Sequence, residues 1–142
     1  MQRCFVLITL VTACADNSVD SNEAAKQAYL GLDGSIPTAI TLGFAGFNAV
    51  SSANIAPQTG SGAAAGTITV TGQVDQGSSA NKGMRLNVDM AGYSDGDVDV
   101  DGANITIIYD TGADPTTQPF LSMQLKGIPT GTLSGTLMGL TR

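Results

Sequence analysis

From residue 67 to the end of the chain, short runs of alternating apolar and polar residues follow one another. Successive side chains of a β-strand point to opposite faces, so this alternation predicts strands that bury one face and expose the other. Asp95-Gly96 and Asp101-Gly102 lie between such runs, a position in which Asp-Gly predicts a tight hairpin. The pattern predicts an antiparallel meander of five or six strands, with apolar positions at Ile68/Val70/Val74, Met84/Leu86/Val88/Met90, Val98/Val100, Ile105/Ile107/Tyr109, Leu121/Met123/Leu125 and Leu133/Leu137.

The segment before this region has the composition of a short helix. Ser21 is a good N-cap, and residues 23–28 include an early acid and several strong helix formers. Gly31 and Gly34 are residues at which such a helix can end. We therefore expect a short helix that begins just after Ser21.

A second helix is predicted between residues 35 and 54, because apolar residues recur there at intervals of three and four. Pro37 would fall in the first turn, where proline is tolerated. Gly43 and Gly46 each weaken a helix by about 1 kcal/mol relative to alanine. Part of the segment also alternates like a strand, so a β-hairpin is the alternative for residues 36–54. The predicted apolar face of the helix consists of Ile36, Ile40, Phe44, Phe47 and Val50.

Together these patterns predict a single α+β domain over residues 23–142, helical over residues 23–54 and a sheet over residues 66–140. The glycine- and proline-rich stretch from Pro57 to Gly66 is expected to be a flexible connection. The apolar face of the sheet needs a cover, and the N-terminal helices provide one in a two-layer domain. An all-β sandwich or barrel is the alternative.

The composition excludes several kinds of chemistry. Twelve acidic and six basic residues give a net charge of −6, which disfavours nucleic acid, because basic residues that neutralise phosphates supply most of that affinity. The absence of histidine excludes a histidine-based catalytic triad and an imidazole-bound metal. We therefore expect neither enzymatic activity nor a nucleic-acid partner, and no cofactor unless the acidic segment described next holds calcium.

Four aspartates alternate with other residues in this acidic segment, residues 95–101. Calcium binds several oxygen ligands at once, and Asp97-Val98-Asp99-Val100-Asp101-Gly102 resembles the opening of an EF-hand loop. The twelfth loop position, a glutamate in that family, is Ile108. In an extended strand the carboxylates would lie about 7 Å apart, so a solvated acidic strand is the favoured interpretation. A calcium-dependent adhesion or scaffold module is the alternative, with Asp95, Asp97, Asp99 and Asp101 as the metal ligands.

A second acidic motif follows a predicted strand. Asp110-Thr111-Gly112 resembles the active-site segment of retroviral-type aspartic proteases. The resemblance implies a dimer in which Asp110 is half of a carboxylate pair, with residues 137–139 as the later apolar element. The favoured interpretation is a turn in which Asp110 caps its own backbone and Gly112 has a positive φ.

The N-terminus combines one basic residue, Arg3, with an apolar run and the sequence Val11-Thr12-Ala13-Cys14. The run is too short to cross a bilayer, which takes about 20 apolar residues. This arrangement resembles the signal peptide and lipobox of bacterial lipoproteins. The resemblance implies removal of residues 1–13, a lipid on Cys14 and a tether over residues 14–22. Ala15 after the cysteine implies transport to the outer membrane.

These observations favour a lipoprotein of the bacterial cell envelope that acts as a non-enzymatic structural or binding module. Its expected partners are a membrane, through the lipid on Cys14, and an envelope protein.

Overall fold

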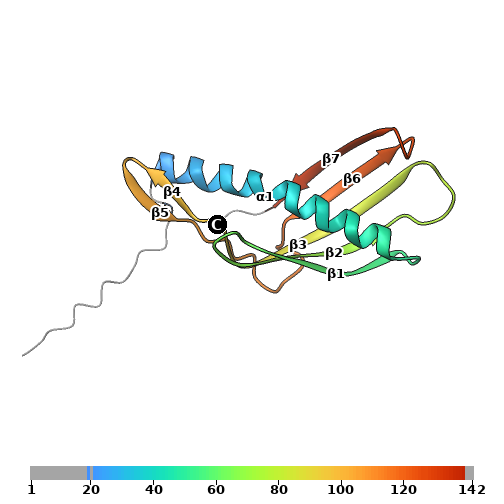
Figure 1. Cartoon of the computed structure of the whole chain (residues 1–142), viewed down its shortest axis with the longest axis horizontal. Helices are drawn as coiled ribbons and strands as arrows, with labels where there is room; N and C mark the ends of the chain where they lie inside the picture. Colours follow the sequence, from blue (N-terminus) through green and yellow to red (C-terminus); the bar gives the residue numbers. More distant parts are fainter. Residues whose placement is uncertain (1–18, 20, 140–142) are drawn as a thin grey trace, which may run out of the picture.

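A computed structural model describes Val19 and residues 21–139 of the chain. Within these residues a long helix, α1, is followed by seven strands (Figure 1). The C-terminal half of α1 lies against a sheet, and a small hairpin stands beside its N-terminal half. The elements are α1 (Asn22–Ala49), β1 (Asn54–Ser61), β2 (Ala65–Val74), β3 (Lys82–Ser94), β4 (Asp97–Val100), β5 (Ala103–Thr106), β6 (Phe120–Lys126) and β7 (Thr132–Met138).

The helix α1 is continuous, so the prediction of two separate helices is wrong. Ser21 caps it as expected, because its hydroxyl accepts a hydrogen bond from the Ala24 amide at 3.0 Å. Gly31, Gly34 and Pro37 all lie inside the helix. A proline in a helix interior costs about 3 kcal/mol, so tertiary packing has to stabilise this continuity.

The two glycines that weaken the helix, Gly43 and Gly46, lie against side chains of the sheet. A Cβ at Gly43 would meet the Leu86 side chain, and a Cβ at Gly46 would meet Ile55. Because these Cβ atoms are absent, the helix backbone approaches the sheet closely. The hairpin alternative for residues 36–54 is therefore wrong, since the helix continues to Ala49. The buried residues of α1 are Ser35, Ala39, Gly43 and Gly46, with Ile40, Leu42, Phe44 and Phe47 partly buried around them.

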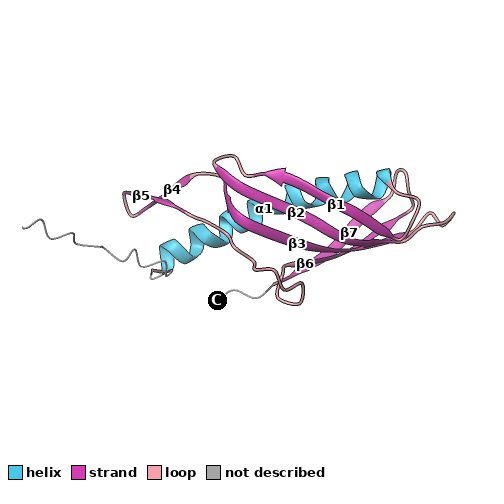
Figure 2. Ribbon diagram, turned by 90° about the horizontal axis from the view of Figure 1, so that it is seen from below, coloured by secondary structure: helices cyan, strands magenta, loops and turns pink. Residues whose placement is uncertain are grey.

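Five strands form one antiparallel sheet in the order β1-β2-β3-β6-β7 (Figure 2). The α+β prediction is thus confirmed in outline, and the all-β alternative is wrong. The flexible connection expected over residues 57–66 is also wrong, because Pro57 and the four residues after it belong to β1. These residues lack regular apolar alternation, so pairing with β2, and not their own pattern, makes them a strand.

The strands β4 and β5 form a separate two-stranded sheet and do not extend the main one. Asp101 and Gly102 make the turn between them, with φ values of 53° and 84°. Type I′ hairpin turns need positive φ at both central residues, so the hairpin predicted at Asp101-Gly102 is confirmed. The hairpin predicted at Asp95-Gly96 is wrong, because β3 pairs with β2 and β6 and not with β4. The strand predicted over residues 105–109 ends at Thr106 instead, and the chain returns to β3 through an isolated bridge.

The hydrophobic core lies between α1 and the face of the main sheet that is turned toward it, called here the inner face. Its strand residues occupy alternate positions, as the sequence predicts. Within residues 21–139 no helix has the length and hydropathy needed to cross a bilayer. The buried strand residues of this cluster are Ile55, Ile68, Val70, Val74, Met84, Leu86, Val88, Met90, Tyr93, Leu121 and Met123.

Candidate functional site

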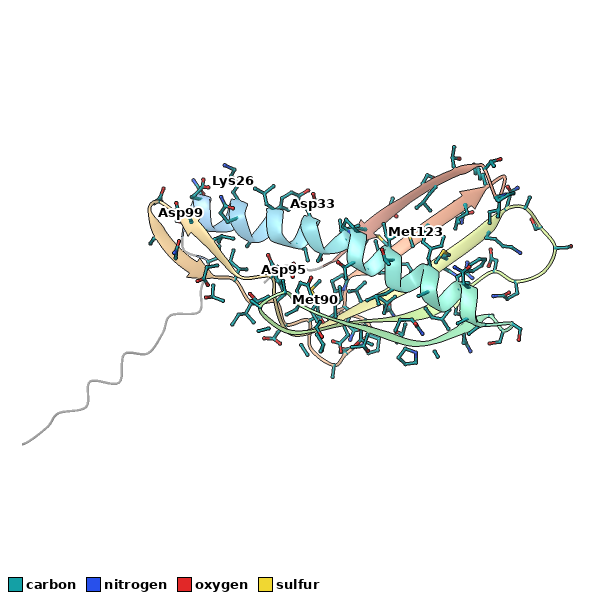
Figure 3. All side chains as sticks on the ribbon, viewed as in Figure 1. Lys26, Asp33, Met90, Asp95, Asp99 and Met123 are labelled. Carbon is teal, nitrogen blue, oxygen red and sulfur yellow. The ribbon has the colours of Figure 1, made fainter. Side chains whose placement is uncertain are left out.

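The four aspartates of the acidic segment do not converge on one point. Asp97 and Asp99 lie on β4, Asp95 precedes this strand and Asp101 lies in the hairpin turn. Figure 3 shows Asp99 beside the start of α1, and Asp95 nearer the sheet. Among the described residues, no three acidic or cysteine side chains form a group that could hold a metal ion.

The aspartates of the β4–β5 hairpin accept hydrogen bonds within the hairpin itself. Asp97 accepts one from the Thr106 hydroxyl, and Asp99 accepts one from the Gly102 amide at 3.1 Å. Both aspartates are exposed, whereas Val100 on the other side of β4 is buried. This is the arrangement of a solvated acidic strand with its valine packed inward.

Asp95 connects the β1–β2 turn to the end of β3. Its carboxylate accepts hydrogen bonds from the Ala63 amide and from the Tyr93 hydroxyl, each at 3.0 Å. Burial, and then the hydrogen bond to Asp95, raise the pKa of Tyr93 above its ordinary value. The Tyr93 hydroxyl therefore stays protonated and remains a donor at neutral pH.

Tyr109 links this region to α1. Its hydroxyl donates a hydrogen bond to the Ala28 carbonyl at 2.7 Å, and the centre of its ring lies 6.5 Å from that of Tyr93. Burial raises the pKa of Tyr109. A Cβ at Gly31 would collide with this hydroxyl. Gly31 is thus a contact position between the helix and Tyr109, and not a helix end.

The Asp110-Thr111-Gly112 motif runs beside β3 without regular secondary structure, so the turn predicted at these residues is not formed; the chain turns at residues 115–117. The Asp110 carboxylate accepts a hydrogen bond from the Gly92 amide at 2.7 Å, and the Thr111 hydroxyl accepts one from the Met90 amide at 2.9 Å. Gly112 has a φ of 72°, which confirms the predicted positive φ. The prediction that the Asp110 side chain caps its own backbone is wrong. The carboxylate caps the Gly92 amide of β3 instead, because the chain after β5 returns alongside β3.

On the opposite, outer face of the sheet, charged residues pair locally. Arg85 lies 2.9 Å from the Asp75 carboxylate, which also accepts a hydrogen bond from the Gly83 amide at 2.8 Å. The Arg85 side chain holds the pKa of Asp75 below its ordinary value. Lys82 lies instead on the inner face, opposite Leu125, where it is buried. Its ammonium donates to the Gly77 carbonyl at 2.6 Å. These contacts fasten the β2–β3 loop to the start of β3.

A wide hollow of about 330 Å³ also lies on the outer face, beside the loop before β6. Its lining contains no charged side chain, so it offers no group for general acid–base chemistry. The lining residues are Asn87, Pro115, Thr116, Thr117, Gln118, Phe120, Met138 and Gly139.

Part of the inner face is open, which sequence reasoning missed. Leu133 and Leu137 of β7 are 45% and 38% exposed, whereas Leu121 of β6 is 4% exposed. The register nevertheless places Leu137 opposite Leu121, and Leu133 opposite Leu125, on the same face. We call Leu125, Leu133 and Leu137 the open strip.

The cause of the open strip is the position of the helix. Most backbone contacts of α1 are with β1, β2 and β4. A helix is about 10 Å wide and strands lie about 4.8 Å apart, so one helix is too narrow to cover five strands. The sequence prediction placed two helices over the sheet, whereas residues 21–139 form a single one.

The predicted lipobox at Val11–Cys14, with the signal peptide over residues 1–13, lies outside the described residues. So does most of the predicted tether, residues 14–22. Known proteins add no further information, since no family model, curated protein or solved structure matches this chain. The open strip is therefore a candidate site on the ground of its geometry and chemistry alone.

Proposed function

We propose that this chain is a lipoprotein of the bacterial cell envelope whose domain is a non-enzymatic, protein-binding module. The observation that carries the binding part is the open strip. Leu133 and Leu137 leave apolar surface in water on a sheet face that is otherwise buried. Burial of such surface against a partner is favourable, at roughly 25 cal/mol per Å².

The polar groups support binding over catalysis. Asp95, Asp97, Asp99 and Asp110 each accept a hydrogen bond from a nearby amide or hydroxyl. Such bonds are typical of turns and caps. An aspartic protease instead needs two carboxylates that share one proton, whereas the Asp110 carboxylate accepts a hydrogen bond from the Gly92 amide of β3.

The position of α1 is compatible with a lipid anchor at the N-terminal end of the domain. The helix begins at Asn22, soon after Cys14, and its first turns lie beside the β4–β5 hairpin (Figure 1). The strands β6 and β7 lie in the other half of the molecule, away from the start of α1. A lipid on Cys14 would thus hold the β4–β5 hairpin nearest the membrane and leave the open strip accessible to a protein in the envelope.

The anchor is tested by mass spectrometry of membrane fractions from bacteria that express the full chain. We expect a mature N-terminus at Cys14 that carries the mass of attached acyl groups. Cys14→Ser should abolish both cleavage and acylation, whereas the matched variant Cys4→Ser should abolish neither. A wild-type chain that starts at Met1 and carries no lipid would contradict the anchor.

The binding function is tested by a photoreactive amino acid placed at Leu137 of the full chain in membranes. We expect illumination to give covalent adducts with protein. The same amino acid at Thr69, on the outer face of β2, serves as the control and should give few adducts. Equal adduct yields at the two positions would contradict binding through the open strip.

A further inference from the structure

The strand β7 forms one edge of the main sheet. Its seven residues pair with β6 without a register shift, and all seven are exposed. On the side away from β6, alternate amide and carbonyl groups of an edge strand have no strand partner. The edge of β7 is therefore regular enough to accept another strand along its whole length.

The opposite edge, β1, is built differently. Pro57 lies within β1 and removes one backbone donor, and the register with β2 shifts between Ile55 and Gln58. Proline and irregular pairing are the devices by which edge strands prevent association. The strand β7 contains no proline, no charged residue and no register shift. Of the two edges, β7 is the one that is open to pairing.

The sequence of β7 is complementary to itself. When two copies run antiparallel about a two-fold axis at Gly135, Leu133 of one copy lies opposite Leu137 of the other. Both leucines face the inner side, because they lie opposite Leu125 and Leu121 in the β6–β7 register. The open strips of the two copies would then join into one apolar band across the interface.

The distribution of charge also favours a second copy of this chain as the partner of β7. Two copies of a chain with a net charge of −6 repel each other over most of their surfaces. The stretch from Gly127 to Met138, which includes β7, has no ionisable side chain. A neutral edge is where two copies approach at the lowest electrostatic cost.

We propose that β7 binds β7 of a second copy of this chain, antiparallel and centred on Gly135, so that the two main sheets become continuous. This inference rests on the proposed function, because it names the partner of the open strip. A two-fold symmetric pairing of β7 with β7 uses the same surface on both copies, as in most homodimers.

The register is tested by cysteine cross-linking of full-length chains in membranes. One chain carries Ser134→Cys and the other, with a different tag, carries Thr136→Cys. Residues opposite each other have Cβ atoms about 4.5–5.5 Å apart, close to disulfide geometry. We therefore expect oxidation to shift both tags together to the mass of a dimer.

A mismatched pair serves as the control for register. Thr132→Cys and Ser134→Cys, on separate chains, would lie about 13 Å apart in the proposed pairing, beyond disulfide reach. Chains without added cysteines serve as the control for cross-links through the native residues Cys4 and Cys14. A cross-link that forms as readily in the mismatched pair as in the matched one would overturn the register and hence the proposal, and so would no cross-link in either.

A charge-swap experiment tests the leucine contacts independently. One chain carries Leu133→Lys and Leu137→Lys, and the other carries Leu133→Glu and Leu137→Glu. Because Leu133 and Leu137 are both partly exposed, we expect these changes to preserve the fold. We expect the dimer to be lost when either variant is expressed alone and restored when the two are expressed together. Equal dimer yields in all three samples would overturn the proposal.

The two proposals fail in different ways. A chain acylated on Cys14, with photo-adducts at Leu137 that contain another protein, would leave the proposed function standing and overturn the self-association. A chain that cross-links through β7 but carries no lipid would overturn the anchor alone.

Discussion

The strands β3 and β7 both present apolar residues to the inner face of one sheet, but only β3 buries them. Met84, Leu86 and Val88 of β3 are at most 2% exposed, whereas both leucines of β7 remain in contact with water. The two strands obey the same alternation, so the alternation determines which face a side chain occupies. Whether that face is covered depends on the path of α1, which crosses near β1 and β2.

The sharpest test of this difference is a matched pair of leucine truncations. Leu86→Ala should lower the free energy of unfolding by about 2–5 kcal/mol, because it leaves a cavity under the helix. Leu137→Ala removes the same atoms from a partly exposed site and should cost less than about 1 kcal/mol. Urea denaturation of the two variants at low protein concentration measures both. Equal losses would mean that β7 is as well covered as β3.

A second pair of substitutions tests whether close approach of the helix creates the covered region. Gly43→Ala should destabilise the fold by about 1–3 kcal/mol, because the new Cβ meets Leu86 in a packed core. Gly34→Ala meets nothing within 4 Å and should stabilise the helix by up to about 1 kcal/mol. Thermal unfolding should thus shift in opposite directions. A stabilising Gly43→Ala would show that the helix has room to move away from β3.

Tyr109 helps to set the direction of the helix and hence which strands it covers. Tyr109→Phe removes the hydrogen bond to the Ala28 carbonyl and should cost about 1 kcal/mol. The control, Tyr29→Phe, alters a side chain that is 67% exposed and should have almost no effect. Hydrogen exchange of the first turns of α1 should rise in Tyr109→Phe only. Unchanged exchange would mean that other contacts direct the helix.

The smallest effect is expected on the outer face, which α1 does not cover. The hydrogen bond from Arg85 holds the pKa of Asp75 in the folded protein below its ordinary value. A lowered pKa stabilises the fold above the unfolded value, and this stabilisation is lost as pH falls through the folded value. Wild type should therefore be slightly more stable than Asp75→Asn at pH 7, and this difference should disappear in acid, below about pH 4.

Arg85→Met provides the control for the Asp75 prediction. If the ion pair is the cause, Asp75→Asn should have little further effect once Arg85 is absent. A pH-dependent difference of the same size in the Arg85→Met background would assign the effect to another group.

Much of the fold follows from local chemistry in the sequence. Ser21 caps the helix, Asp101-Gly102 makes the predicted hairpin turn, and the alternating residues of β2, β3 and β6 are buried on one face. Each of these features depends on residues close together in the chain. Local patterns were therefore sufficient to predict them.

The features that the sequence did not predict depend on distant partners. The sequence predicts Gly31 as a helix end and Gly43 as a helix-weakening residue, yet they are contact points for Tyr109 and Leu86. The strand β1 exists because it pairs with β2. The open strip depends on the position of a helix far away in the chain. Tertiary contacts decide such features, and no periodicity within the segment itself reports them.

The β4–β5 hairpin has a consequence for how this chain tolerates added sequence. It leaves the main sheet after β3, and the bridge between Tyr93 and Tyr109 holds the two ends of this excursion side by side. The next strand, β6, pairs directly with β3, so the main sheet does not need the hairpin for its order. The entropy of closing a loop rises only slowly with its length. The tip at Asp101-Gly102 is thus the natural point at which a peptide or a small domain could be grafted without altering the sheet.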